Sequence, residues 1–151
     1  QIKWPNDIYC QGKKIAGILL EMSGEIDNTD NLIVGIGINV NLRTNDLPVA
    51  ISTHSTSLLE ICGREIATDN LLITVLKDLD SYYQEFLNHG FSSILLEFKS
   101  RCLHLGKAIE TTRGLDIIRG INTDIDDMGN LIVQCQDNLV RISTGDVKVL
   151  K

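Results

Sequence analysis

The spacing of hydrophobic residues changes twice along the chain and divides it into three zones. In the first zone, residues 1–42, apolar residues form short runs at 14–21 and 32–41, joined by a polar connection at 24–31. Neither run alternates cleanly with polar residues, which is typical of strands that are covered on both faces. We therefore expect a mixed β-sheet with helices packed on it.

The second zone, residues 52–103, has the periodicity of helices. Apolar residues recur at steps of three and four between 72 and 86, which predicts an amphipathic helix. Thr68 and Asp69 are suitable N-caps for this helix, and Gly90 lies where a helix commonly ends in glycine. Shorter helices are expected over 57–62 and 92–101.

The third zone begins near Gly106 and consists of short apolar runs separated by turn-forming residues. The runs lie at 108–111, 115–119, 131–134, 139–142 and 147–150. This regular spacing predicts a small closed β-barrel or a meander. So short a segment buries only a thin core, so we expect it to lean on the helical zone. The expected fold class is α+β, with one domain over 1–103 and a small β-barrel over 104–151.

Charge and composition exclude several classes of protein. Lys and Arg number 14 against 20 Asp and Glu, and a net charge of −6 repels phosphate backbones, so we do not expect a duplex-binding surface. No apolar run approaches the roughly 20 residues that span a bilayer. The chain starts without an initiator Met or a signal-peptide layout, so we expect it to come from the middle of a longer protein.

The cysteines bear on the cellular compartment. Cys10, Cys62, Cys102 and Cys135 are widely scattered, with no Cys-x-x-Cys pair. Four cysteines can form two disulfides, but the favoured interpretation is scattered, buried thiols in a reducing cytosol. The sequence therefore predicts a cytoplasmic protein.

The densest cluster of unusual residues is Lys3-Trp4-Pro5-Asn6-Asp7. Pro5 pushes Trp4 into an extended conformation, so a strand that carries Lys3 is expected to end here in a turn. Asn6 and Asp7 suit that turn, and the only Trp of the chain is expected to pack under the corner. Taken alone, this cluster favours an ordinary strand end with a solvated lysine.

A second cluster combines a lysine with glycines. Lys14 stands at the start of an apolar run that contains Gly17, and a glycine inside a strand often marks the close approach of a ligand or of another backbone. The motif Gly-Ile-Gly-Ile-Asn at 35–39 lacks the third glycine and the helix of a dinucleotide fingerprint. Binding of an anionic or planar ligand and simple packing explain these positions equally well.

The remaining polar residues predict no further chemistry. His54, His89 and His104 have no Ser or Asp patterned around them, so a nucleophilic triad is not expected. The acidic residues at 124–127 lack the glutamate of a calcium-binding loop, and a solvated hairpin turn is favoured instead. We expect no metal site made by the residues of this chain.

Together, the motif at 3–7, the run Lys-Ile-Ala-Gly-Ile-Leu at 14–19 and the glycine motif at 35–39 closely resemble the biotin–protein ligase family. The order of a helical zone and a small barrel that ends in Ser-Thr-Gly-Asp-Val at 143–147 also resembles this family, so the resemblance covers essentially the whole chain. It implies a ligase core of the class II synthetase type, incomplete here, followed by a barrel of the Src-homology type. Lipoate ligases share this fold but, as a family, lack the first motif.

The resemblance implies ATP-dependent biotinylation of one lysine on a biotin carboxyl carrier protein through biotinyl-5′-AMP. Biotin and ATP are then substrates, and Mg²⁺ accompanies the ATP phosphates. Lys3 matches the catalytic position. Contacts to biotin or to the adenylate are implied for Asn6, Lys14, Gly17, Gly35 and Asn39. The remaining motif residues, Trp4, Pro5 and Asp7, shape the turn.

One feature of the family is absent from this sequence. The Gly- and Arg-rich loop that covers biotin and the adenylate precedes the first motif in the family and does not occur here. We therefore expect a fragment that does not catalyse alone and that exposes apolar strand faces. The expected partner is the carrier domain of a carboxylase, and no membrane is involved.

Several alternatives remain open at this stage. The chain can be a non-catalytic module for docking or dimerisation, and a homodimer is compatible with the sequence. It can also belong to a biotin-responsive transcriptional repressor, but nucleic acid would then bind only through an upstream domain that this sequence lacks.

Overall fold

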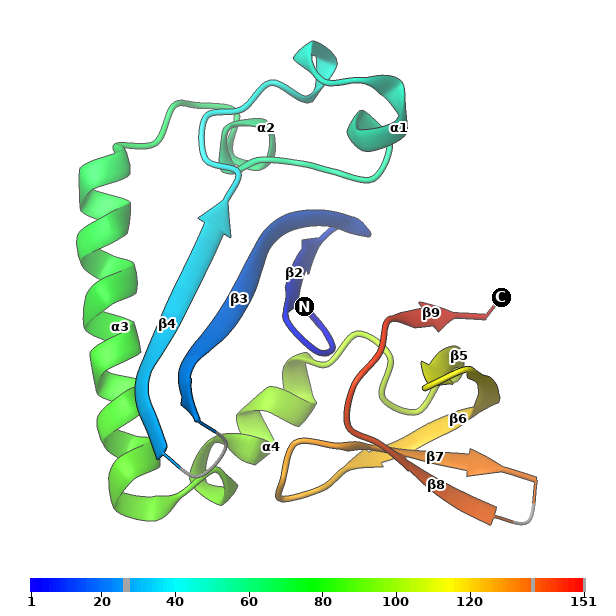
Figure 1. The fold of residues 1–151 in the computed structure, drawn as a ribbon. Coiled ribbons are helices and arrows are strands. Elements are labelled where there is room, and N and C mark those ends of the chain that lie inside the picture. Colours follow the sequence, from blue (N-terminus) through cyan, green and yellow to red (C-terminus); the bar gives the residue numbers. More distant parts are fainter. Residues whose placement is uncertain (26–27, 137, 151) are drawn as a thin grey trace. The chain divides into compact units, whose positions relative to one another are not determined.

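The computed structural model describes residues 1–25, 28–136 and 138–150 (Figure 1). It divides into two compact units, one of residues 6–68 and the other of residues 1–5 together with 69–151. The domain boundary expected between 103 and 104 is a different division and stays a prediction.

The unit of residues 6–68 is built on three strands, β2 (Asp7–Cys10), β3 (Lys13–Glu25) and β4 (Asn28–Ile38). Both pairings, β2 with β3 and β3 with β4, are antiparallel, so the expected mixed sheet is wrong for the described part of this unit. Strands β3 and β4 also extend through most of the predicted polar connection at 24–31, because backbone pairing continues beyond the apolar runs. Residues 26–27 lie outside the described residues.

The apolar side chains of β3 and β4 are largely exposed. Leu19, Leu20, Leu32 and Ile33 are 54–59% exposed. Within the unit of residues 6–68, the described residues therefore do not supply the expected cover on both faces, because a hydrophobic pattern shows which faces need burial and not which segment buries them. This finding agrees with the expectation of exposed strand faces.

After β4 the chain turns through η1 (Thr44–Asp46), α1 (Val49–Ser52) and α2 (Leu58–Cys62) at the end of the hairpin (Figure 1). The helix predicted at 57–62 is confirmed as α2. The Ser57 side chain caps it by accepting the backbone N–H of Glu60, and Gly63 ends it with a φ of 66°.

The other unit contains the strand β1 (Ile2–Lys3) and the helices α3 (Thr68–His89) and α4 (Ser92–Arg101), which confirm the two remaining helix predictions. No helix in the described ranges is both long enough and apolar enough to cross a bilayer.

A five-stranded antiparallel sheet completes this unit. Its strands are β5 (Ala108–Arg113), β6 (Asp116–Ile125), β7 (Leu131–Cys135), β8 (Asn138–Ile142) and β9 (Val147–Val149), in the order β8-β7-β6-β5-β9. The expected closed barrel is wrong for the described residues, since the terminal strands β8 and β9 are not paired with each other. The alternative, a meander, is confirmed for β5 to β8, in which each strand pairs with the next along the chain. After β8 the chain crosses to the far side of the sheet, where β9 pairs with β5.

The core of this unit combines the sheet with residues from elsewhere in the unit. Trp4 is 4% exposed and belongs to the same buried cluster as Ile109, Leu131 and Ile142. Leu95 and Phe98 of α4, with several other half-buried residues, pack against it. The expectation that the small sheet leans on the helical zone is therefore confirmed, and the Trp4 side chain is buried as expected for the corner of the first motif.

The four cysteines, Cys10, Cys62, Cys102 and Cys135, are free thiols, as the favoured interpretation of the sequence expects. Their expected burial is wrong, because three of them are only half-buried and Cys62 is exposed.

Candidate functional site

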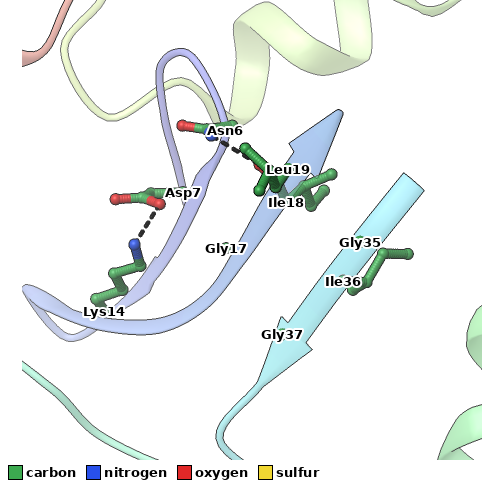
Figure 2. Close-up of a pocket in the computed structure, with 9 residues that line it drawn as sticks. All are labelled: Asn6, Asp7, Lys14, Gly17, Ile18, Leu19, Gly35, Ile36 and Gly37. Carbon is green, nitrogen blue, oxygen red and sulfur yellow. Dashed lines mark hydrogen bonds and ion pairs between the residues drawn. The ribbon is translucent and has the colours of Figure 1, made fainter. Parts of the chain in front are cut away.

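A pocket of about 460 Å³ opens beside strands β2, β3 and β4, and Figure 2 shows its lining. Its volume lies in the range of small-molecule sites. The lining includes four of the predicted ligand contacts: Asn6, Lys14, Gly17 and Gly35. Asp7, Ile18, Leu19, Ile36 and Gly37 complete it.

Glycines keep one part of this pocket open. Gly17 of β3 lies opposite Gly37 of β4, so two facing positions have no side chain. A Cβ atom on Gly17 would lie 3.1 Å from Oδ1 of Asp7 and 3.2 Å from Nζ of Lys14. Glycine at position 17 therefore leaves the room that these two charged groups occupy.

The Lys14 ammonium forms an ion pair with the Asp7 carboxylate at 2.5 Å, as Figure 2 shows. The Lys14 backbone is fixed as well, because its N–H donates to the carbonyl of His54 and its carbonyl accepts the N–H of Thr56. The Lys14 side chain is 42% exposed, so its ammonium remains accessible to an anion in the pocket. Because exposed ion pairs contribute only about 0–1 kcal/mol to stability, the main effect of this one is to orient the lysine.

Asn6 is fastened to β3 by two hydrogen bonds. Its side-chain Nδ2 donates to the backbone carbonyl of Ile18 over 2.7 Å, and its backbone carbonyl accepts the backbone N–H of Ile18 over 2.9 Å. These bonds leave Oδ1 as the polar atom that Asn6 can present to a ligand.

Asn39 is not part of the pocket lining. Its Nδ2 donates to the carbonyl of Thr56 at 3.0 Å, and its backbone N–H donates to the carbonyl of Ile15. The described contacts therefore give Asn39 a supporting position next to the segment that holds Lys14.

Lys3 belongs to the other unit. Its ammonium lies 2.7 Å from Oδ1 of Asp146, and its side chain is 18% exposed. Next to it, the Trp4 indole N–H donates to the carbonyl of Gly129 at 2.9 Å. The first two residues of the motif at 3–7 are thus bonded to loops of the five-stranded sheet.

His104 is a buried group that sequence reasoning left without a role. The backbone N–H of Trp4 donates to Nε2 of His104 at 3.0 Å. Nδ1 then carries the proton and donates to the side-chain oxygen of Asn122 at 3.0 Å. Burial lowers the pKa of His104 from 6.5 to about 4, helped by the positive charges of Lys3 and Lys107. The local signal for this burial was the apolar sequence Leu-His-Leu.

The acidic segment at 124–127 lies where β6 ends, with Asp124 still in the strand and Asp126 and Asp127 in the expected hairpin turn. Oδ1 of Asp126 accepts the backbone N–H groups of Met128 and Asn130, at 3.0 and 2.9 Å. Across the described ranges, no group of three or more His, Cys, Asp or Glu side chains is arranged to hold a metal ion.

Comparisons with known proteins match both ends of the chain to one kind of enzyme. The profile of the "Biotin/lipoate A/B protein ligase family" matches residues 1–39, and that of the "Biotin protein ligase C terminal domain" matches residues 104–150. The Bifunctional ligase/repressor BirA of Bacillus subtilis is 34% identical over 148 residues, which are 98% of this chain and 46% of the relative. The Biotin--[acetyl-CoA-carboxylase] ligase of Mycobacterium tuberculosis is 29% identical over 99% of this chain and 53% of the relative.

A solved structure agrees in fold as well as in sequence. The biotin protein ligase of Aquifex aeolicus, in complex with biotin and ATP, superposes with a TM-score of 0.86 and is 31% identical. The superposition covers 99% of this chain and 61% of the Aquifex chain. The chain spans about half the length of the curated relatives above. On these matches, the chain belongs to the biotin protein ligase family and corresponds to the C-terminal part of the catalytic domain together with the family's C-terminal domain.

Proposed function

We propose that this chain is part of a ligase that uses ATP to attach biotin to one lysine of a biotin carboxyl carrier protein. The observation that carries the proposal is the pocket that Lys14, Gly17 and Gly35 line together. It occurs in a chain whose fold matches a ligase solved with biotin and ATP. The glycines allow a ligand to approach the backbone closely, and the ammonium suits an anionic one.

The proposed reaction has two steps. A carboxylate oxygen of biotin attacks the α-phosphorus of ATP, the bond to the bridging oxygen breaks, and pyrophosphate leaves with biotinyl-5′-AMP formed. The amine of the acceptor lysine then attacks the acyl carbon, loses a proton and expels AMP. Both steps gather negative charge on phosphate and acyl oxygens, which a fixed ammonium stabilises.

The residues take the following roles in this proposal. Lys14, oriented by Asp7, binds the anionic part of biotinyl-5′-AMP, and Asn6 offers Oδ1 as an acceptor. Lys3 carries the catalytic role that the family resemblance implies, and Asp146 restrains its ammonium. Mg²⁺ arrives with the ATP phosphates.

Gly17 and Gly35 give the ligand access to the backbone of the hairpin, and Asn39 supports the wall on the adenine side. The acceptor is the carrier domain of a carboxylase, in the cytoplasm.

An assay of the complete protein that carries this chain tests the proposal. With biotin, MgATP and an apo-carrier domain, the wild type is expected to release pyrophosphate and to label the carrier. Lys3→Ala is expected to slow adenylation about a hundredfold, which corresponds to about 3 kcal/mol of lost transition-state stabilisation. The loss of one oxyanion-hole donor in other enzymes has an effect of this size. Lys3→Arg is not expected to restore the rate, because a planar guanidinium does not replace a compact ammonium. Lys13→Ala, an exposed lysine outside the pocket lining, is the matched control and is expected to keep the wild-type rate.

The outcomes separate the alternatives. A folded wild type that forms no adenylate and labels no carrier would contradict the proposal and support a non-catalytic docking module. Labelling with lipoate but not with biotin would assign the protein to the lipoate ligases. A Lys3→Ala variant with a nearly normal rate would refute the role of Lys3 and leave the ligase assignment intact.

A further inference from the structure

Within the unit of residues 1–5 and 69–151, backbone hydrogen bonds fix the chain on both sides of Lys3. The carbonyl of Ile2 accepts the backbone N–H of Leu103 at 2.7 Å, and the backbone N–H of Trp4 donates to the His104 ring at 3.0 Å. We propose that His104 is a positioning residue for Lys3, through which the C-terminal sheet holds the catalytic ammonium in place. This inference rests on the proposed function.

The His104 ring is itself held in one orientation. It is fully buried, and its Nδ1–H donates to the side-chain oxygen of Asn122, whose amide nitrogen donates to the carbonyls of Asp124 and Ile132. The Asn122 backbone is fixed by bonds to Gly106 and Lys107. The ring therefore presents Nε2 as an acceptor in a fixed direction. A hydrogen-bond donor, here the Trp4 N–H, must face it.

The acceptor role requires a neutral ring. A protonated imidazole has N–H donors at both nitrogens, so its Nε2 would face the N–H of Trp4 donor to donor. The charged or titratable groups near the ring are the ammonium groups of Lys3 and Lys107 and the Cys102 thiol, whose Sγ lies 3.4 Å from Nδ1. Burial favours the neutral form most, and the two ammonium groups favour it further.

The Lys3 side chain has a second restraint from the same unit. Its ammonium pairs with Asp146, whose carbonyl accepts the Thr111 hydroxyl at 2.8 Å. His104 therefore fixes the position of the backbone next to Lys3, and Asp146 restrains the position of the Lys3 ammonium. If the bond between Trp4 and His104 is lost, the backbone of Lys3 shifts. The ion pair with Asp146 then shifts as well, because both interactions restrain the same residue.

The proposed contacts to biotin lie in the unit of residues 6–68, and this predicts a split in the kinetics. If His104 acts only through Lys3, its loss slows adenylation without weakening the binding of biotin. A small displacement of a reacting group is sufficient, because a misplacement of about 1 Å can cost a hundredfold in rate.

The test uses the complete protein and compares four variants. His104→Leu removes the acceptor, His104→Asn keeps an amide that is too short to reach Trp4, and His104→Gln carries an oxygen near the position of Nε2. The control, Ile142→Val, removes one methylene from a fully buried side chain of β8 and leaves every bond of Trp4 in place. Single-turnover adenylate formation at saturating biotin and ATP is measured with the dissociation constant for biotin, below the melting temperature of each variant.

The expected result is a fall in the adenylation rate of about tenfold to a hundredfold for His104→Leu and His104→Asn. Biotin affinity is expected to stay within about twofold, and His104→Gln to recover the rate to within about threefold of the wild type. Equal rates for His104→Leu and Ile142→Val would overturn the inference. If His104→Leu does not fold, equal rates for the folded Asn and Gln variants would overturn it. A wild type that forms no adenylate would instead overturn the proposed function.

Discussion

Acidification is expected to destabilise the sheet unit through one buried histidine, His104. Its pKa falls from 6.5 to about 4 on folding, because the ring is buried and lies near the positive charges of Lys3 and Lys107. The unfolded chain therefore binds more protons than the folded one between pH 4 and pH 6.5. The free energy of unfolding is highest above pH 6.5 and falls as the pH drops through this window.

The magnitude follows from the size of the pKa change. The full change from 6.5 to about 4 corresponds to about 3 kcal/mol, of which about 2 kcal/mol is lost between pH 7 and pH 5. Asp and Glu side chains titrate mainly below about pH 5, so this window separates the histidine from the carboxylates.

Urea unfolding at a series of pH values between 7 and 5 measures this effect. The fluorescence of Trp4, the only Trp of the chain, reports on the unit because the side chain is 4% exposed in its core. His104→Gln is expected to lose the pH dependence, whereas His54→Gln, which removes an exposed histidine, is expected to keep it. Equal slopes for the wild type and His104→Gln would refute the buried neutral state of this ring.

Two further predictions concern the unit of residues 6–68. Gly17→Ala places a Cβ atom 3.1 Å from the Asp7 carboxylate and 3.2 Å from the Lys14 ammonium, so it is expected to weaken the binding of biotinyl-5′-AMP about tenfold. In a double-mutant cycle measured by calorimetry, the same change on a Lys14→Ala background is expected to add little, and full additivity would contradict the reasoning. Ser57→Ala removes the N-cap of α2 that accepts the Glu60 N–H and is expected to cost about 1 kcal/mol in urea unfolding; an unchanged midpoint would show that the cap is not needed.

Local sequence signals predicted the elements whose chemistry is local. Pro5 marked the end of β1, and the periodicity of 72–86 marked α3. The turn at Asp126 was recognisable because its side chain bonds to backbone groups within four residues. These features depend on residues that are close together in the sequence, so a pattern of residue types is sufficient to predict them.

Other features depend on pairing between distant segments and left no local signal. The short strand β2 exists because it pairs with β3. The backbone hydrogen bonds that fix Lys14 come from residues 54–56. The bond between Trp4 and His104 joins residues 100 positions apart. The antiparallel pairing of the first sheet and the open edges of the second are likewise set by register and not by composition.

The candidate site divides in the same way. The motifs named Asn6, Lys14, Gly17 and Gly35, and the structure brings these four residues to one pocket. Their geometry was not predictable, because the ion pair of Lys14 with Asp7 depends on the bulge in β2–β3 pairing between Ile8 and Tyr9. The catalytic role of Lys3 remains a prediction.

A crystal structure of the complete protein with bound biotinyl-5′-AMP tests the central claim most directly. We predict that the acyl-phosphate group lies within hydrogen-bonding distance of Nζ of Lys14, with the ligand against the backbone at Gly17 and Gly35. A ligand bound elsewhere, with Lys14 still paired only with Asp7 and facing solvent, would contradict the account.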